Sequence, residues 1–248
     1  MQPLILHAIA AEEQTYWWFV GRRRLALDWL HDARLPERSR VLDLGCGTGA
    51  MLEDLATISQ AYGTDVSEVS LQYCRSRGQP RLAFADGTRL PFANGVFQGV
   101  VSLDVIEHIE DDAAVFAELH RVCAESAVVV ITVPALRWLW SSRDERLAHK
   151  RRYHRDELIE RAKQAGFQVE KCSYYCVTLF PAFAVAVLLR GRSGKTPQVS
   201  QDVPRLPRWV NACLLRVLLV EQWVMRLVNY PVGVSLFCVL RKPLTGGP

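Results

Sequence analysis

The strongest constraint on the fold is a regular alternation of short apolar runs with amphipathic segments. The apolar runs have the length of strands, and the segments between them space their apolar residues as helices do. The expected strands are 40–45, 61–67, 81–87, part of 97–109 and 127–134. The expected helices are 50–59, 68–77, 111–123 and 154–167. This order predicts an α/β fold in which helices cover both faces of a parallel sheet.

The first expected strand runs into a glycine-rich loop within residues 41–49, which read VLDLGCGTG. Ligands of doubly wound sheets bind at the carboxyl ends of the strands, so we expect this loop at a binding site. Gly45, Gly47 and Ala50 also fit the pattern G-x-G-x-x-A, which is found in dinucleotide-binding proteins. The glycines alone therefore leave the kind of cofactor open.

Acidic residues accompany the first three expected strands, as Asp43, Asp65 and Asp86. A carboxylate beside the loop repels a pyrophosphate, whereas S-adenosylmethionine (SAM) carries a sulfonium and an ammonium cation. Asp65 is placed to accept from ribose hydroxyls of either cofactor, and Asp86 from an adenine amino group. The charges favour SAM. An NAD(P)-dependent oxidoreductase is the alternative, and it leaves Asp86 unexplained.

Five motifs in chain order resemble those of class I SAM-dependent methyltransferases: VLDLGCGTG, GTDVS, FADGTRLPF, VVSLDVIEHIED and AVVVITVP. The run DVIEHIED is most similar to the branch that includes the ubiquinone O-methyltransferases. The similarity spans roughly residues 38–175 and departs from the usual pattern at Gln98, where an acid is common. It implies a doubly wound, Rossmann-like sheet of seven strands, in which the last two, at 167–177 and 233–243, are antiparallel.

The resemblance also implies the cofactor contacts. The glycine loop is expected at the amino acid part of SAM, Asp65 at the ribose and Asp86 at the adenine. The full set of expected cofactor residues is Asp43, Gly45, Cys46, Gly47, Gly49, Asp65, Val66, Asp86, Gly87, Leu103 and Asp104.

Methyl transfer to a hydroxyl requires alignment of the acceptor and removal of a proton. His108 follows the fourth strand, near the expected methyl group, and is the first candidate base. His149 is the reserve candidate. Glu107 and His108 are adjacent and should point apart, so we expect no metal site. O-methylation is the leading interpretation. A SAM-binding partner subunit without catalysis is the alternative from another class of protein.

Two further segments are candidates for substrate contact. The segment 15–24 (TYWWFVGRRR) is expected to act as a lid through Tyr16, Trp17, Trp18 and Phe19, with Arg22 to Arg24 receiving an anion. The alternative is an amphipathic helix whose aromatic residues pack on the sheet. A basic loop after the fifth strand offers Arg152 for an anion and Tyr153 for orienting the acceptor. The residues after the fourth strand lack the Pro-Pro-aromatic run typical of nucleobase methyltransferases. The acceptor is therefore expected to be a small molecule and not a nucleic acid.

About fifty residues separate the last two expected strands, which is too long for a hairpin turn. Residues 173–189 carry no charge, and residues 191–208 read as a net basic linker. Residues 209–230 form a helical pattern with polar residues such as Glu221 on one side and apolar residues such as Trp223 on the other. The apolar side must be covered by the sheet, a second copy of the chain or a membrane surface.

We favour membrane contact and a lipid-like acceptor with an anionic group. The chain then divides into a helical lid (1–37), a SAM-binding part (38–178 and 232–248) and a helical apolar insertion (179–231). The net charge of +4 is mild, and seven scattered cysteines without a CxxC pair indicate reduced thiols. The first residues do not read as a signal peptide. We therefore expect a cytoplasmic protein, peripheral at the inner face of a membrane.

Overall fold

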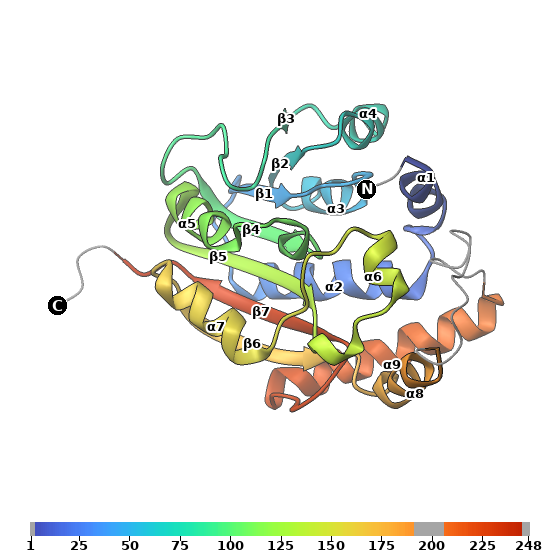
Figure 1. The fold of residues 1–248 in the computed structure, drawn as a ribbon. Coiled ribbons are helices and arrows are strands. Elements are labelled where there is room, and N and C mark those ends of the chain that lie inside the picture. Colours follow the sequence, from blue (N-terminus) through green and yellow to red (C-terminus); the bar gives the residue numbers. More distant parts are fainter. Residues whose placement is uncertain (1–2, 191–205, 245–248) are drawn as a thin grey trace.

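The computed structural model describes residues 3–190 and 206–244, and these build a seven-stranded sheet (Figure 1). The strand order is β3-β2-β1-β4-β5-β7-β6. The first five strands run parallel, whereas β7 lies antiparallel between β5 and β6. The strands are β1 (Arg40–Leu44), β2 (Gln60–Asp65), β3 (Leu82–Phe84), β4 (Phe97–Leu103), β5 (Cys123–Pro134), β6 (Gln168–Tyr175) and β7 (Ser235–Arg241). The predicted doubly wound seven-stranded fold is confirmed.

Helices cover both faces of the sheet. On one face, α2, α3, α4 and α9 share a buried apolar cluster with the strands, and on the other face α5 and α7 do so. The helices are α1 (Pro3–Glu12), α2 (Trp17–Asp32), α3 (Ala50–Ala56), α4 (Glu68–Ser76), α5 (Asp112–Val122), α6 (Ser142–Arg146), α7 (Arg155–Gln164), α8 (Phe180–Arg190) and α9 (Arg208–Leu227), with short 3₁₀ turns η1 (Ile106–His108) and η2 (Arg137–Leu139).

Local sequence signals explain where several elements begin and end. The side chain of Ser67 accepts from the amide of Ser70 at 3.3 Å and caps α4. Strand β4 ends at Leu103 because Asp104 adopts a left-handed conformation with φ of +57°. The chain then turns into η1. This turn places the residues after the fourth strand at the carboxyl edge of the sheet.

Helix α2 of the N-terminal segment packs on the sheet. Leu25 and Leu30 of α2 are buried on the sheet, and the ring of Trp29 packs 5.7 Å from that of Phe237. Helix α9 crosses α2 at Gly21, where an added Cβ would lie 2.4 Å from a methyl carbon of Leu218. Helix α2 is therefore part of the layer that covers the sheet. The turn after α1 contacts the glycine loop, where Glu13 accepts from Thr48.

Helices α8 and α9 lie between β6 and β7 in chain order. The orientation of α9 is the reverse of that expected for a surface helix. Its polar side faces the protein: Glu221 accepts from the amides of Val177 and Thr178 at 2.9 and 3.1 Å, and Gln222 donates to the carbonyl of Gly21. Asn211 also faces inward and accepts from the amide of Trp17. The apolar side of α9 is exposed. Its exposed apolar residues are Trp209, Val217, Val220, Trp223 and Leu227.

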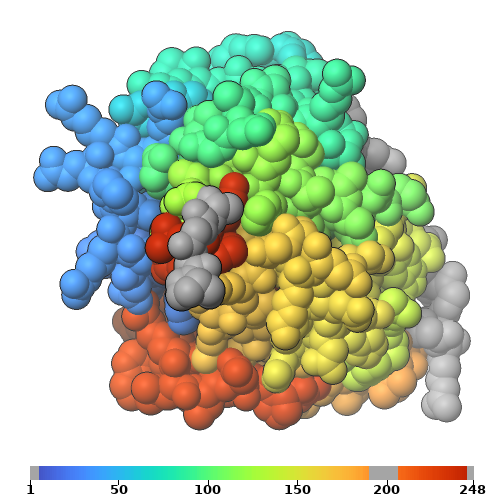
Figure 2. Space-filling model, turned by 90° about the vertical axis from the view of Figure 1, so that its left-hand side faces the viewer, coloured from blue at the N-terminus to red at the C-terminus, as the bar shows by residue number. Residues whose placement is uncertain are grey.

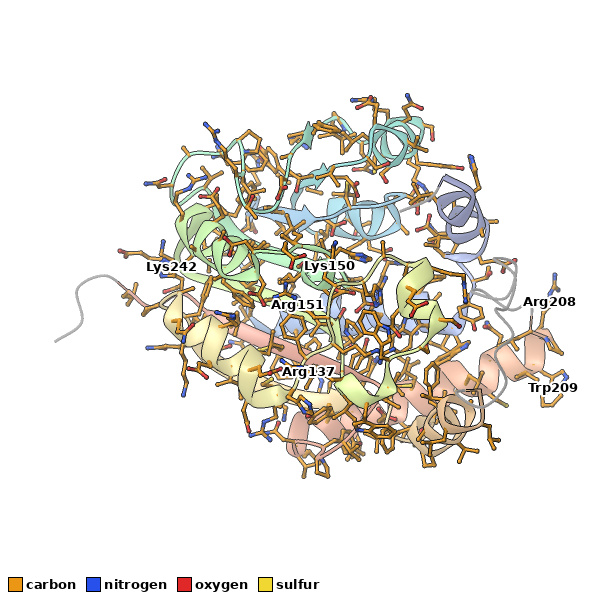
Figure 3. All side chains as sticks on the ribbon, viewed as in Figure 1. Arg137, Lys150, Arg151, Arg208, Trp209 and Lys242 are labelled. Carbon is orange, nitrogen blue, oxygen red and sulfur yellow. The ribbon has the colours of Figure 1, made fainter. Side chains whose placement is uncertain are left out.

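Helix α8 exposes Val185, Leu188 and Leu189 in the same manner. We call these residues, together with the exposed apolar residues of α9, the outer apolar surface. Figure 3 shows Trp209 and Arg208 projecting from the start of α9, away from the sheet. The opposite end of α9 forms the lower edge of the face shown in Figure 2. Most of the expected linker (191–205) lies outside the described residues. In the described part of the chain, no helix has both the length and the apolarity that crossing a bilayer requires.

Candidate active site

A cavity of about 230 Å³ opens at the carboxyl ends of the parallel strands. Its floor is the loop after β1 and the turn after β4, and its walls come from α1, α2, α6 and α8. The lining combines charged residues with an apolar set: Leu6, Ile9, Trp18, Phe19, Met51, Leu103, Leu147 and Phe183. A cavity of this kind accepts a small molecule with both charged and apolar parts.

The glycine loop is folded tightly over the end of β2. The amides of Gly45 and Cys46 both donate to the carbonyl of Thr64, at 2.8 and 2.9 Å. Gly45 has φ of +71°, and an added Cβ would lie 2.5 Å from Val105, so only glycine fits there. The amide of Gly47 donates to Asp65 at 2.9 Å. The loop is thus preorganised, with open space above Gly47, where no heavy atom lies within 4 Å of an added Cβ.

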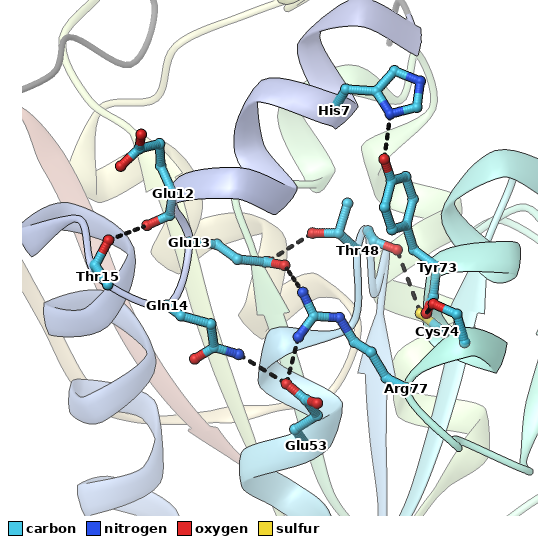
Figure 4. A network of polar contacts seen from close by, with 12 residues as sticks. His7, Glu12, Glu13, Gln14, Thr15, Thr48, Glu53, Tyr73, Cys74 and Arg77 are labelled. Carbon is cyan, nitrogen blue, oxygen red and sulfur yellow. Dashed lines mark hydrogen bonds and ion pairs between the residues drawn. The ribbon is translucent and has the colours of Figure 1, made fainter.

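The turn after α1 is fastened to this loop by a polar network (Figure 4). Glu13 is buried and accepts from the hydroxyl of Thr48 at 2.6 Å and from Arg77 at 2.5 Å. Gln14 donates to Glu53 at 2.8 Å, and Glu53 also accepts from Arg77. The N-terminal residues therefore close the cavity on the side of the glycine loop.

Asp43 is buried beneath the loop at 3% exposure, and its Oδ2 has no hydrogen-bond partner among the described residues. Burial, and then the charge of Asp65, raise the pKa of Asp43 to about 8. A buried carboxyl group without a donor is costly to keep. Its position at the cavity floor suits a ligand that carries a cation.

Other carboxylates of the cavity already have cationic partners. The pairs are Glu13 with Arg77, Asp104 with Arg22, and Asp144 with Arg152. Asp104 also accepts from the hydroxyl of Thr132 at 2.9 Å. In the described part of the chain, Oδ2 of Asp43 and both carboxylate oxygens of Glu107 are buried without a hydrogen-bond partner. The cavity therefore has two separate places that favour positive charge.

Glu107, His108 and His149 meet at the second of these places. His149 Nδ1 lies 2.9 Å from Asp144, and its Nε2 lies 3.8 Å from Glu107. Burial, and then the charge of Asp104, raise the pKa of Glu107 well above its usual range. Burial and then His149 lower the pKa of His108 to about 4, so His108 is neutral near pH 7. Although burial opposes ionisation, His149 and Arg152 hold the pKa of Asp144 at about 2.

The structure brings only part of the expected cofactor set to the cavity. The expected residues that line it are Asp43, Gly45, Cys46, Gly47, Leu103 and Asp104. The others lie outside it: Gly49, Asp65, Val66, Asp86 and Gly87. Asp65 supports the loop, and Asp86 accepts from the amide and hydroxyl of Thr88. The expected contacts of Asp65 with ribose and of Asp86 with adenine stay predictions.

The expected substrate contacts need correction. Tyr16 and Trp17 do not line the cavity; Trp18, Phe19 and Arg22 do. Helical geometry is the reason, because residues four apart share a face and Trp18 lies four residues before Arg22. That spacing was visible in the sequence.

In the basic loop, the hydroxyl of Tyr153 donates to Asp112 at 3.0 Å, away from the cavity. Arg152 lines the cavity but donates to Asp144 and to the carbonyl of Ala135, so it positions Asp144. Asp144 was missed, since nothing in its sequence context distinguishes it from other surface acids.

The expectation that Glu107 and His108 point apart is wrong. Each of these residues and His149 offers a ligand atom, and the three atoms lie within 4.8 Å of one another. The 3₁₀ turn of η1 is the reason, because it follows neither the strand nor the α-helical periodicity on which the expectation rested. His108 and His149 both line the cavity, as expected of the two candidate bases.

Comparison with known proteins supports the class of protein that the fold indicates. Residues 42–131 match the family model of a methyltransferase domain. The chain is 30% identical over 163 residues, 64% of its length, to a "Probable S-adenosylmethionine-dependent methyltransferase" of Mycolicibacterium smegmatis, and the match covers 62% of that protein. It is 35% identical over 100 residues to the malonyl-[acyl-carrier protein] O-methyltransferase of Legionella pneumophila, which is 38% of this chain and 35% of the relative. The chain thus spans less than two thirds of these curated relatives.

Solved structures share the fold at low sequence identity. Phosphoethanolamine N-methyltransferase 2 of Haemonchus contortus, in complex with SAM, aligns with a TM-score of 0.61 and 19% identity, over 95% of this chain and 57% of that one. The methyltransferase bound to the Trm112 activator of Haloferax volcanii aligns with a TM-score of 0.61 and 18% identity, over 98% and 97%.

The sheet order, the glycine loop and these matches define a class I SAM-dependent methyltransferase domain. The family match and the curated relatives support SAM as its cofactor, the choice that the glycine pattern left open. Asp43 fits this cofactor because its unpartnered oxygen lies beside the loop, where a cationic amino acid group can reach it. Membership of the ubiquinone O-methyltransferase branch stays a prediction.

Proposed function

We propose that this protein transfers the methyl group of SAM to a hydroxyl oxygen of a small hydrophobic molecule. One observation carries the proposal: a single cavity holds the unpartnered Asp43 at the glycine loop and the buried group of Glu107, His108 and His149. The first suits the cofactor, and the second suits an acceptor that must lose a proton. Several relatives are named O-methyltransferases, which supports oxygen as the acceptor atom.

Methyl transfer from a sulfonium is an in-line displacement for which SAM supplies the reactive carbon. The protein must hold the acceptor oxygen in line with that carbon and exclude water. An apolar side of the cavity serves both needs. It is formed by Trp18 and Phe19 of α2 and by Leu147, which follows α6. The turn after α1, fastened through Glu13, closes the cofactor side.

The acceptor class follows from the remaining lining. Phe183 of α8 contributes an apolar wall, and Arg143 of α6 has an Nε without a hydrogen-bond partner among the described residues. An acceptor with an acyl, prenyl or aromatic part and one anionic group would satisfy both features. Arg143, rather than the paired Arg152, is the residue we assign to the anion.

The outer apolar surface supports delivery of this acceptor from a membrane. Trp209, Trp223 and Leu227 are 72%, 65% and 74% exposed on a helix whose polar side is turned inward. Large exposed apolar faces mark contact with another apolar surface, and tryptophan is enriched at membrane interfaces. Arg208 and Arg216 lie on the same exposed part of α9 and suit anionic head groups. The protein would then act as a peripheral protein at the cytoplasmic side of a membrane.

Helix α8 links this surface to the cavity. Phe183 lines the cavity, whereas Leu188 and Leu189 of the same helix are exposed. The ring of Trp138 in η2 packs 5.8 Å from that of Phe180 at the start of α8 and is itself half exposed. Helix α8 would therefore give a lipid-like acceptor an apolar path from a membrane to the methyl donor.

The test uses SAM with a labelled methyl group and matched pairs of hydroxyl acceptors that differ in chain length and charge. We expect labelled product from long-chain anionic acceptors, and stronger turnover when they are supplied in vesicles containing anionic phospholipid. Equal turnover of short water-soluble and long-chain acceptors would refute the lipid-like class. Binding of S-adenosylhomocysteine without product from any acceptor would favour the non-catalytic partner subunit.

Sedimentation with the same vesicles separates the candidates for the outer apolar surface. Co-sedimentation that is weakened in a Trp223→Ser variant supports contact with the membrane. A concentration-dependent dimer without vesicle binding would instead assign the surface to a second copy of this chain.

A further inference from the structure

The cavity contains a second binding feature that the cofactor does not explain. It is formed by Glu107 and His108 of η1 and by His149 of the loop after α6. The loop and η1 are held together, because the amide of Lys150 donates to the carbonyl of Glu107 at 2.8 Å. The three side chains therefore meet on two elements that are fixed to each other.

Glu107 is fully buried, and neither carboxylate oxygen has a hydrogen-bond partner in the described residues. The Nε2 atom of His149 lies 3.8 Å from Oε1, which is too far for a hydrogen bond. Arg22, which also lines the cavity, is paired with Asp104. A buried carboxyl group that faces a cavity without a donor is costly to ionise, and a bound cation would offset that cost.

Each of the two histidine rings is oriented by a contact of its Nδ1 atom. His108 Nδ1 lies 3.3 Å from the carbonyl of Ala148, to which it donates, and His149 Nδ1 lies 2.9 Å from the carboxylate of Asp144. Asp144 is itself held by Arg152 at 2.8 Å. These bonds leave Nε2 of each ring available. Histidines that bind metal ions in proteins are fixed in this way, with the other ring nitrogen donating to a carbonyl or carboxylate.

We propose that Glu107, His108 and His149 form a binding site for a divalent first-row transition-metal ion. Two imidazole nitrogens and one carboxylate oxygen suit zinc, iron, cobalt or manganese, and they leave coordination positions open. Donor atoms of one ion lie roughly 3 to 3.5 Å apart at bond lengths of about 2.1 Å. The cluster, now within 4.8 Å, closes by side-chain rotation when the ion binds.

This site deepens the proposed function and, in its chemical role, rests on it. An open coordination position beside the methyl donor would take the acceptor hydroxyl and lower its pKa. The O–H bond then breaks and the proton leaves to solvent. The oxygen forms a bond to the methyl carbon, and the electron pair of the carbon–sulfur bond stays on sulfur, which gives S-adenosylhomocysteine.

The test measures metal binding directly. The full chain is freed of metal with a chelator and titrated with Co²⁺, followed by calorimetry and by the visible absorption of bound Co²⁺, and then with Zn²⁺ as competitor. We expect one ion per chain and an affinity that falls at least about 100-fold in Glu107→Gln and in His149→Ala. Asp144→Asn, which removes the charge of the residue that orients His149 and leaves the three proposed ligands in place, should lower the affinity about tenfold.

Matched controls are Glu110→Gln and His31→Ala, whose side chains are 82% and 86% exposed. They should bind Co²⁺ as the wild type does. Equal Co²⁺ affinity in the wild type and in Glu107→Gln would overturn the site, as would the absence of visible bands at one equivalent. Glu107→Gln keeps the side-chain shape, so it remains informative if His149→Ala does not fold. Binding of S-adenosylhomocysteine by each variant is measured separately, so failure of the metal site is distinguished from failure of the cofactor site.

Discussion

In the ligand-free protein, the free energy of unfolding of Asp43→Asn relative to that of the wild type should increase as the pH rises. Burial raises the pKa of Asp43 from 3.8 to about 8. Between these values the folded chain holds a proton that the unfolded chain has released. The free energy of unfolding of the wild type therefore falls by about 1.4 kcal/mol per pH unit from this group, and the fall ends near the folded pKa. The Asp43→Asn variant lacks this dependence.

The expected size follows from that slope. Between pH 6 and pH 7.5 the stability margin of Asp43→Asn over the wild type should grow by about 2 kcal/mol. For a chain of this length that is roughly 4 to 8 °C in Tm. Denaturant unfolding of both proteins at the two pH values measures it, and other titrating groups cancel in the difference. A margin that stays constant or shrinks with pH would refute the assignment of a buried, unpartnered carboxyl group.

The same carboxyl group sets the pH dependence of cofactor binding. The ligand's cation requires the ionised form, so binding below the folded pKa releases a proton. Affinity of the wild type for S-adenosylhomocysteine should rise up to about tenfold per pH unit between pH 6 and 7.5. The affinity of Asp43→Asn should be lower and flat over this range, as calorimetry would detect.

Three further predictions test other parts of the structure. Trp223→Ser should weaken sedimentation with anionic vesicles about tenfold, because it removes an exposed apolar anchor, without changing turnover of a short soluble acceptor. Leu218→Ala should lower the free energy of unfolding by about 2 to 5 kcal/mol, because Leu218 is buried against Gly21. Leu188→Ala should change it by no more than about 0.5 kcal/mol, because Leu188 is exposed. Equal losses in the two variants would contradict the orientation of α9. Glu13→Gln should weaken binding of S-adenosylhomocysteine about tenfold in calorimetry, because its bonds to the loop hold the cavity closed; unchanged affinity would show that the closure is not needed.

The sequence was sufficient to predict the sheet, because its strands and helices each follow one periodicity. The alternation from residue 40 onward predicted the parallel strands, and the spacing of Gly45 and Gly47 predicted the loop at their carboxyl edge. These features depend on local sequence, so tertiary packing did not change them. The resemblance to a known family added the antiparallel position of β7.

Residues whose roles depend on contacts between distant segments could not be predicted. The sequence predicted that α9 has a polar side. It did not predict that this side faces inward, where Asn211, Glu221 and Gln222 form hydrogen bonds with segments distant in the chain. The convergence of Glu107 with His149 depends on a 3₁₀ turn and on a loop some forty residues later. Asp144 is recognisable only through the partners it holds.

The most direct measurement of the central claim is a calorimetric titration of the purified chain with S-adenosylhomocysteine, beside NADH and with Asp43→Asn as the matched variant. We predict one site of micromolar affinity for S-adenosylhomocysteine, no binding of NADH, and a loss of about 10- to 100-fold in the variant, as expected for a hydrogen bond to a charged group. Binding of NADH without S-adenosylhomocysteine, or equal affinity of the two proteins, would contradict the account of this site.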